Sequence, residues 1–219
     1  MDRRKPRAEG ASVSPGFRVA YLVSRFPKLT ETFIAEEIAA VERGGVAVDL
    51  YPLQRERTAL VHPTAATLMG KARFTPLLAP RYASDHLRAV SADPGSYARI
   101  VATLVRANWG SARYLLGALA FFPKAVHLAG RLQRSGIGHV HAHFASHPAA
   151  VAFVIHRLTG LRWSFTAHGS DLHRDRHMLA EKVAAASFVV AISEYNRRVI
   201  LDSCGEWAAS KVIVVHCGV

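Results

Sequence analysis

The chain has 219 residues, of which 50% are hydrophobic and 20% charged, a composition that excludes a disordered protein and fits one well-buried domain. Its formal net charge is +12, and residues 72–134 carry nine basic against two acidic side chains, which favours anionic partners such as nucleotide phosphates, acidic lipids or nucleic acid. Two cysteines, Cys204 and Cys217, cannot form a metal site between them and indicate reduced thiols in an intracellular compartment.

The first fifty residues follow a strand, helix, strand pattern. Residues 1–16 are basic and rich in Pro, Ser and Gly but lack the apolar core of a signal peptide, so we expect an unstructured leader. Residues 17–24 are a nearly continuous apolar run, typical of a strand buried on both faces. Thr30 is the expected N-cap of a helix that ends at Gly44, and residues 46–53 predict the second strand. This order predicts a parallel sheet.

The middle of the chain departs from that pattern. Residues 54–80 allow at most one short strand, at 72–75. Residues 81–134 predict a long helical insertion, broken near Pro94, Gly110 and Pro123.

Two features of the insertion bear on a membrane surface. Arginines recur every seven residues and would form one basic stripe if Gly110 does not break the helix: Arg99, Arg106 and Arg113. The apolar stretch 114–122 is too short to span a bilayer and is expected to end at Pro123, which leaves a core helix or an interfacial helix.

From residue 138 the alternation of strands and helices resumes. We expect strands at 138–143, 162–167, 188–192 and 211–216, and helices at 148–158, 180–186 and 194–201. The sequence therefore predicts an α/β fold, a single Rossmann-like doubly wound parallel sheet with a helical insertion.

Ligands of such sheets bind outside the carboxyl ends of the strands. Several polar side chains follow strand ends in this sequence, namely Lys28, Thr30, His143, His168, Asp171, Ser193 and His216. The Thr30 helix start, with Lys28 beside it, could bind an anion. The sequence has no Gly-x-Gly-x-x-Gly fingerprint, no phosphate loop of the Gly-x-x-x-x-Gly-Lys type and no Gly-x-Ser-x-Gly elbow.

Four histidines gather at one predicted strand and the turn after it: His139, His141, His143 and His147. Three interpretations stay open at this point. A zinc hydrolase could use His141, His143 and His147, although no carboxylate lies within the cluster. The histidines could instead be hydrogen-bonded structural residues, or His143 alone could face the ligand.

The motifs in order resemble those of the family 4 retaining glycosyltransferases, most closely the exopolysaccharide or colanic-acid type. The resemblance rests on Phe26-Pro27-Lys28-Leu29-Thr30-Glu31-Thr32-Phe33-Ile34, His141-Ala142-His143-Phe144, Phe165-Thr166-Ala167-His168-Gly169-Ser170-Asp171 and Gly218-Val219. It covers residues 17–219, with Thr30 standing where Ser is commoner. It implies one half of a GT-B fold: the amino-terminal, acceptor-side domain, without the carboxyl-terminal donor domain.

The resemblance also implies roles for individual residues. His168 would stabilise charge at the reacting centre and Asp171 would orient its loop. Substrate contacts would come from Lys28, Thr30, Glu31, His143, Gly169, Ser170, Ser193 and Gly218. Retention would follow from the leaving phosphate assisting the acceptor hydroxyl on the same face. No metal and no cofactor is expected, because the nucleotide sugar is a substrate.

The implied reaction moves a hexose from a nucleotide sugar to a lipid-linked glycan acceptor in cell-surface polysaccharide synthesis. We expect a cytoplasmic protein, peripheral at an anionic inner membrane surface, that is inactive without its donor domain. Nucleic acid is not an expected partner. A non-catalytic sugar-binding or membrane-binding module is the alternative from a different class.

Overall fold

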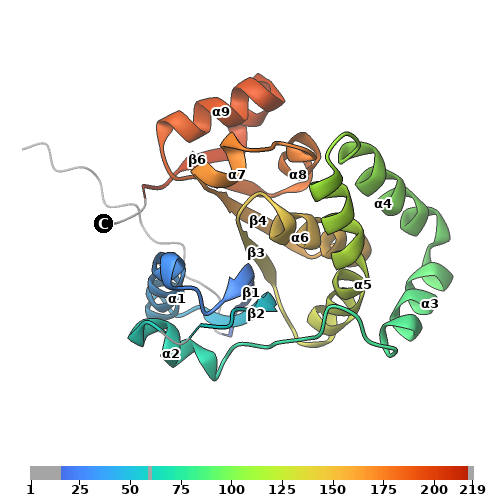
Figure 1. The fold of residues 1–219 in the computed structure, drawn as a ribbon, viewed down its shortest axis with the longest axis horizontal. Helices are drawn as coiled ribbons and strands as arrows, with labels where there is room; N and C mark the ends of the chain where they lie inside the picture. Colours follow the sequence, from blue (N-terminus) through green and yellow to red (C-terminus); the bar gives the residue numbers. More distant parts are fainter. Residues whose placement is uncertain (1–15, 59–60, 217–219) are drawn as a thin grey trace, which may run out of the picture.

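Six parallel strands form one sheet in the order β2-β1-β3-β4-β5-β6, at the centre of Figure 1. The computed structural model describes residues 16–58 and 61–216. The strands are β1 (Arg18–Phe26), β2 (Ala47–Arg55), β3 (His139–His143), β4 (Arg162–Ala167), β5 (Phe188–Ala191) and β6 (Val212–Val214). The predicted doubly wound parallel sheet is confirmed.

The strand order reverses between β1 and β3, where β1 continues to β2 on one side and β3 to β4 on the other. This switch point opens a crevice at the carboxyl ends of the two strands. Beyond β2, the prediction of a short strand at 72–75 is wrong. The segment is reduced to one parallel bridge between Leu50 and Ala72, fixed by a 2.7 Å hydrogen bond from Arg73 N to Leu50 O.

Helix α1 (Thr32–Arg43) covers one face of β1 and β2, and α2 (Pro63–Met69) packs beside it (Figure 1). The prediction that Thr30 caps this helix is wrong. Residues Leu29–Glu31 form a 3-10 turn, closed by a hydrogen bond from Glu31 N to Lys28 O, and α1 begins only after it. Helix α2 starts with Pro63 at its first position, where a missing N–H costs nothing.

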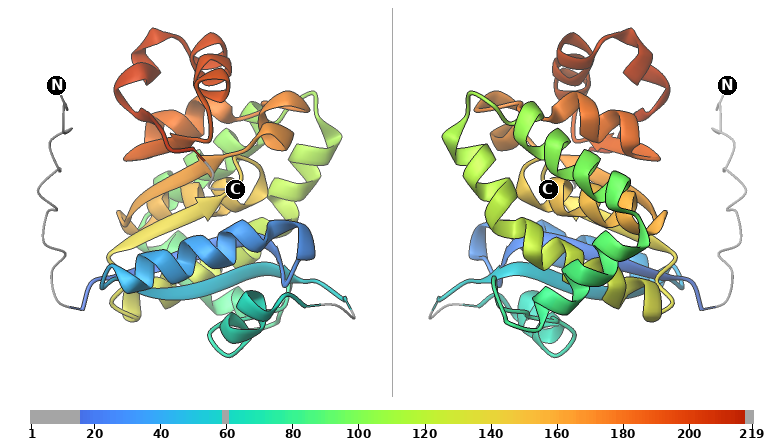
Figure 2. Two further views of the ribbon diagram at one scale, coloured as in Figure 1. Left: turned by 90° about the vertical axis from the view of Figure 1, so that its left-hand side faces the viewer. Right: turned by 90° about the vertical axis from the view of Figure 1, so that its right-hand side faces the viewer.

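On the other face, α6 (His147–Thr159) lies against the sheet and α5 (Ala112–Arg134) lies on α6. Helices α3 (Tyr82–Ala92) and α4 (Pro94–Ala107) form the outer layer, shown in green in the right-hand view of Figure 2. Breaks near Pro94 and Gly110 are confirmed.

The predicted break at Pro123 is wrong, because α5 runs through it as one 23-residue helix. Its neighbours Phe122, Lys124 and Ala125 are buried, and this packing offsets the cost of the proline. By length and composition α5 could cross a membrane, with 44% of its apolar window buried in the domain. Since its inner face packs on α6, we interpret α5 as a core helix of this domain.

The single arginine stripe is not formed. Arg99 and Arg106 lie on α4 and Arg113 lies on α5, and Gly110, with a φ of +93°, lies in the turn between the two helices.

The carboxyl-terminal third adds α7 (Gly169–His173), α8 (Leu179–Ala185), α9 (Glu194–Cys204) and a 3-10 turn at Glu206–Ser210. Helix α7, predicted as a loop, and the 3-10 turn are the elements that sequence analysis missed here. Residues 1–15 of the expected leader and the terminal Gly218 lie outside the described residues.

Candidate functional site

A pocket of about 560 Å³ lies at the carboxyl edge of the sheet, at the switch point. Four strand ends contribute to its wall, and α5 closes it from the side. Its lining residues include Arg25 at the end of β1 and Lys28 after it, Gln54 and Glu56 at β2, Phe144, Ser146 and His147 after β3, Ser170, Asp171 and Arg174 after β4, and Arg113, Tyr114 and Phe121 on α5.

The cations at the pocket differ in their pairing. Lys28 Nζ lies 2.6 Å from Glu31 Oε1, and Arg25 lies 3.5 Å from Glu56, so both are partly neutralised. Arg113 and Arg174 are exposed and have no ion-pair partner within the described part of the chain. These two guanidiniums are therefore the charges available to an anionic ligand.

His168 and Asp171 form a capping box at the start of α7. The carboxylate of Asp171 accepts a hydrogen bond from His168 N at 2.8 Å, while the His168 side chain accepts from the backbone of Asp171. Burial raises the pKa of Asp171 to about 6, against the opposing effect of its backbone N–H donors. Burial lowers the pKa of His168 to about 4, so its imidazole is neutral at pH 7.

The turn between β3 and α6 is held by two buried charged groups. Asp171 Oδ2 accepts from Ala145 N, and Lys182 Nζ donates to Ala145 O. Burial lowers the pKa of Lys182 to about 8. Next to Ala145, Phe144 has a φ of +78°, a strained conformation for an aromatic residue that persists only where its surroundings impose it.

Behind the pocket, His143 is fully buried between three polar neighbours. Its Nδ1 lies 3.4 Å from His168 Nε2, and its Nε2 lies 3.3 Å from Glu37 Oε1. Tyr21 Oη donates to the same Glu37 oxygen at 3.0 Å. Burial raises the pKa of Glu37, but His143 and Tyr21 beside it bring that pKa down to about 2, so Glu37 is ionised.

Residues 30–219 match the family model of Glycosyltransferase Family 4. This chain belongs to glycosyltransferase family 4. No curated protein matches the sequence.

Solved structures support the same fold for this family 4 domain. Anabaena HepE (Alr3699), in complex with UDP-glucose, is 13% identical with a TM-score of 0.51 over 92% of this chain and 44% of its own. The UDP-N-acetylglucosamine 2-epimerase of Rickettsia bellii is 10% identical with a TM-score of 0.52 over 92% and 45%. S. aureus MnaA, solved with UDP, is 10% identical with a TM-score of 0.50 over 90% and 43%. The chain thus spans less than half the length of these proteins and matches a Rossmann-like half of a GT-B fold.

Within the family 4 domain, the structure brings six of the ten predicted site residues to the pocket or directly behind it. Lys28, Glu31, Ser170 and Asp171 line the pocket. His143 and His168 lie behind it, 0% and 7% exposed. The others lie away from its wall: Gly169 in α7, Thr30 exposed in the 3-10 turn, and Ser193 as the N-cap of α9, accepting from Asn196 N at 3.1 Å.

Sequence reasoning missed Arg113 and Arg174 as pocket residues and Glu37 as the partner of His143. Of these three residues, only Glu37 could have been found from the sequence around it. It lies between Ile34 and Ile38, both buried, so it is a carboxylate on the apolar face of an amphipathic helix. The placement of the two arginines depends on tertiary packing.

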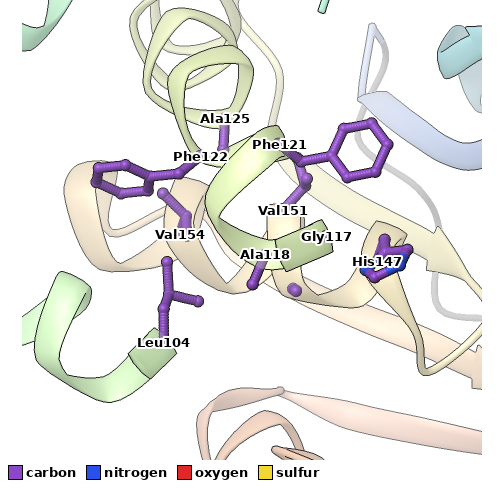
Figure 3. A pocket seen from close by; sticks show the side chains of 10 residues that line it. Leu104, Gly117, Ala118, Phe121, Phe122, Ala125, His147, Val151 and Val154 are labelled. Atoms are coloured by element: carbon purple, nitrogen blue, oxygen red, sulfur yellow. The ribbon is translucent and has the colours of Figure 1, made fainter. Parts of the chain in front are cut away.

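The cluster of His141, His143 and His147 is not formed. His147 packs against Tyr114 and Phe121 of α5, with ring centroids 5.5 Å apart in each case, and Figure 3 shows it beside Gly117. His141 and His143 instead contact Tyr21 on the α1 side of the sheet. The residue that joins them is Glu37. The zinc hydrolase built on these three histidines is therefore excluded by geometry.

Proposed function

We propose that this family 4 domain is the acceptor-side half of a retaining glycosyltransferase that transfers a hexose from a nucleotide sugar to a glycan acceptor. The observation that carries the proposal is the pocket at the switch point, which combines free guanidiniums with hydroxyl, carboxylate and aromatic groups. A sugar ring presents hydroxyls at its rim and apolar C–H faces, and this lining suits both.

The donor half of the cleft would come from a second Rossmann-like domain. HepE, solved with UDP-glucose, and MnaA, solved with UDP, are more than twice as long as the aligned part, and both support a nucleotide sugar as the donor. When two such domains face each other, the free Arg113 and Arg174 would add positive charge where the diphosphate leaves.

The role proposed for His168 is positional and electrostatic. Its imidazole is neutral and is held by Asp171 on one side and His143 on the other, so its fixed dipole would act on charge that develops near the reacting centre. Asp171 is unsuited to attack a sugar, since its carboxylate oxygens accept from the backbone of His168 and Ala145. This supports a mechanism in which the leaving phosphate, rather than a protein carboxylate, assists the acceptor hydroxyl.

The proposal also specifies that the acceptor is lipid-linked and that the domain works at an anionic membrane surface. Ala112, Leu116 and Leu119 are exposed along one side of α5, Leu116 at 66%, and Trp109 before the helix is 72% exposed. Arg113 on the same turn lines the pocket. An interfacial contact through these apolar side chains would bring the pocket next to lipid headgroups, at the inner face of the cell membrane.

The experiment compares sugar transfer by the 219-residue chain alone with transfer by the same chain joined to a GT-B donor domain. Radiolabelled UDP-hexoses serve as donors and membranes of the source cells as acceptor. Transfer is expected only with the donor domain. Sugar transfer by the 219-residue chain alone would contradict the proposal that transfer requires a donor domain. A folded two-domain protein that transfers no sugar would favour the non-catalytic binding module.

A further inference from the structure

A group of three metal-ligating side chains lies between α1 and β3, outside the pocket. Glu37, His141 and His143 each direct one ligand atom to a common region, and these atoms lie within 4.8 Å of one another. Both histidines are at least nine-tenths buried. We propose that these three residues bind one divalent transition-metal ion, and that zinc fits their donor set.

The contact between His143 and Glu37 is the second observation that points to an ion. His143 Nε2 and Glu37 Oε1 lie in ion-pair contact at 3.3 Å without hydrogen-bond geometry, so this nitrogen, on a side chain that is 0% exposed, has no hydrogen-bond partner among the described residues. Two ligands of a tetrahedral zinc ion, each bound at roughly 2.0–2.1 Å, lie roughly 3.3 Å apart. The pair is therefore spaced as metal ligands are.

The outer contacts of His141 and Glu37 also suit a metal. A metal-bound histidine usually donates its second ring N–H to a neighbouring acceptor. His141 Nδ1 lies 2.8 Å from Ser164 Oγ, which can accept that proton. The carboxylate of Glu37 accepts from Tyr21 Oη at 3.0 Å.

Closing around the ion requires one local change. His141 Nε2 would give up its 3.1 Å hydrogen bond to Thr166 Oγ1 and bind the metal instead. The hydrogen bond from His141 Nδ1 to Ser164 Oγ would keep the ring in place. The Glu37 side chain is 39% exposed, so an ion can enter beside it and a water molecule can complete the coordination.

An ion held by Glu37 of α1 and by His141 and His143 of β3 would join α1 to β3 from outside the pocket. The binding itself does not depend on the proposed transfer reaction.

Zinc binding to the chelator-treated 219-residue chain tests the proposal, measured by elemental analysis after dialysis and by competition with a fluorescent zinc indicator. We expect one zinc per chain. Glu37→Gln and His143→Asn should each weaken binding by on the order of 10–100-fold or more. Cobalt should give the intense visible bands of a tetrahedral ion.

Matched variants separate this site from adventitious binding. Glu36→Gln changes the exposed neighbour on α1, and His147→Gln changes the histidine beside α5; both should bind zinc as the wild type does. Circular dichroism checks that each variant is folded. The proposal is overturned if the wild type holds no stoichiometric zinc, or if folded His143→Asn binds it with unchanged affinity.

Discussion

Asp171 and Lys182 hold opposite polar groups of the same residue, because the carboxylate accepts from Ala145 N and the ammonium donates to Ala145 O. Asp171 lies in α7 and Lys182 in α8, so two elements that come later in the sequence fix the turn that follows β3. That turn carries Phe144, Ser146 and His147 into the pocket. The pocket wall therefore depends on two buried charged groups, of which Asp171 lines the pocket and Lys182 does not.

Replacing Asp171 by Asn should change the pH dependence of stability. The pKa of Asp171 rises from 3.8 in the unfolded chain to about 6 in the folded one, chiefly through burial. The folded state then keeps a proton that the unfolded state releases, so the group's contribution is fully present below pH 3.8 and is lost as the pH rises to 6. Relative to Asp171→Asn, the wild type should lose about 3 kcal/mol of unfolding free energy over this interval. Urea unfolding of both proteins across that range measures it, and parallel curves would contradict it.

Lys124 should be a structural lysine rather than part of a basic surface. Its ammonium donates to the carbonyls of Pro52, Leu53 and Thr75, and burial lowers its pKa to about 8. Lys124→Met leaves buried carbonyls without a donor and should lower the unfolding free energy by about 2 kcal/mol or more.

The control is Lys71→Met, which removes a half-exposed pair with Glu42 and should cost about 0–1 kcal/mol. Chemical denaturation measures both changes. Equal losses in the two variants would contradict the assignment of Lys124.

Gly117 should be required by the ring of His147. A Cβ at Gly117 would lie 2.1 Å from His147 Cε1, in the crevice between α5 and α6 that Figure 3 shows. Gly117→Ala should therefore destabilise the domain by about 1–3 kcal/mol, although alanine favours a helix.

In the His147→Ala background the clash is absent, so Gly117→Ala should instead stabilise by up to about 1 kcal/mol. A double-mutant cycle measured by urea unfolding tests this change of sign. The same effect of Gly117→Ala in both backgrounds would refute the role of His147.

Membrane binding should depend on the exposed side of α5. Leu116→Ser combined with Leu119→Ser removes apolar side chains that are 66% and 39% exposed, and should weaken binding to anionic vesicles by about 10-fold or more. Leu87→Ser, which removes a leucine 68% exposed on α3, is the control. Vesicle sedimentation at low and high salt measures both, and wild-type binding to neutral vesicles that equals binding to anionic ones would contradict the proposal.

The sheet could be predicted because most of its strands are short apolar runs between helices and turns. Phe165 and Trp163 in β4 and Ala20 and Leu22 in β1 are 0% exposed, as parallel strands require. The errors lie where tertiary packing overrides local preference. Pro123 predicts a helix end, but α5 continues because its flanks are buried.

The candidate site could be predicted only for residues that follow strand ends. His143 and His168 satisfy that rule, and the structure brings their rings within hydrogen-bonding reach. Glu37, Arg113 and Arg174 reach the region from helices or a later turn, so no strand-end rule could place them. His147 follows β3 as predicted, yet it enters α6 and turns to the other face of the sheet.

The most direct test of the sugar-transfer site is the transfer rate of the two-domain protein carrying His168→Ala. The account predicts a loss of about 100-fold or more with the fold intact, since a positioned group at the reacting centre contributes at least that much. His173→Ala, which removes an exposed histidine of α7, should leave the rate unchanged. A His168→Ala protein that is folded and transfers sugar at the wild-type rate would contradict the account.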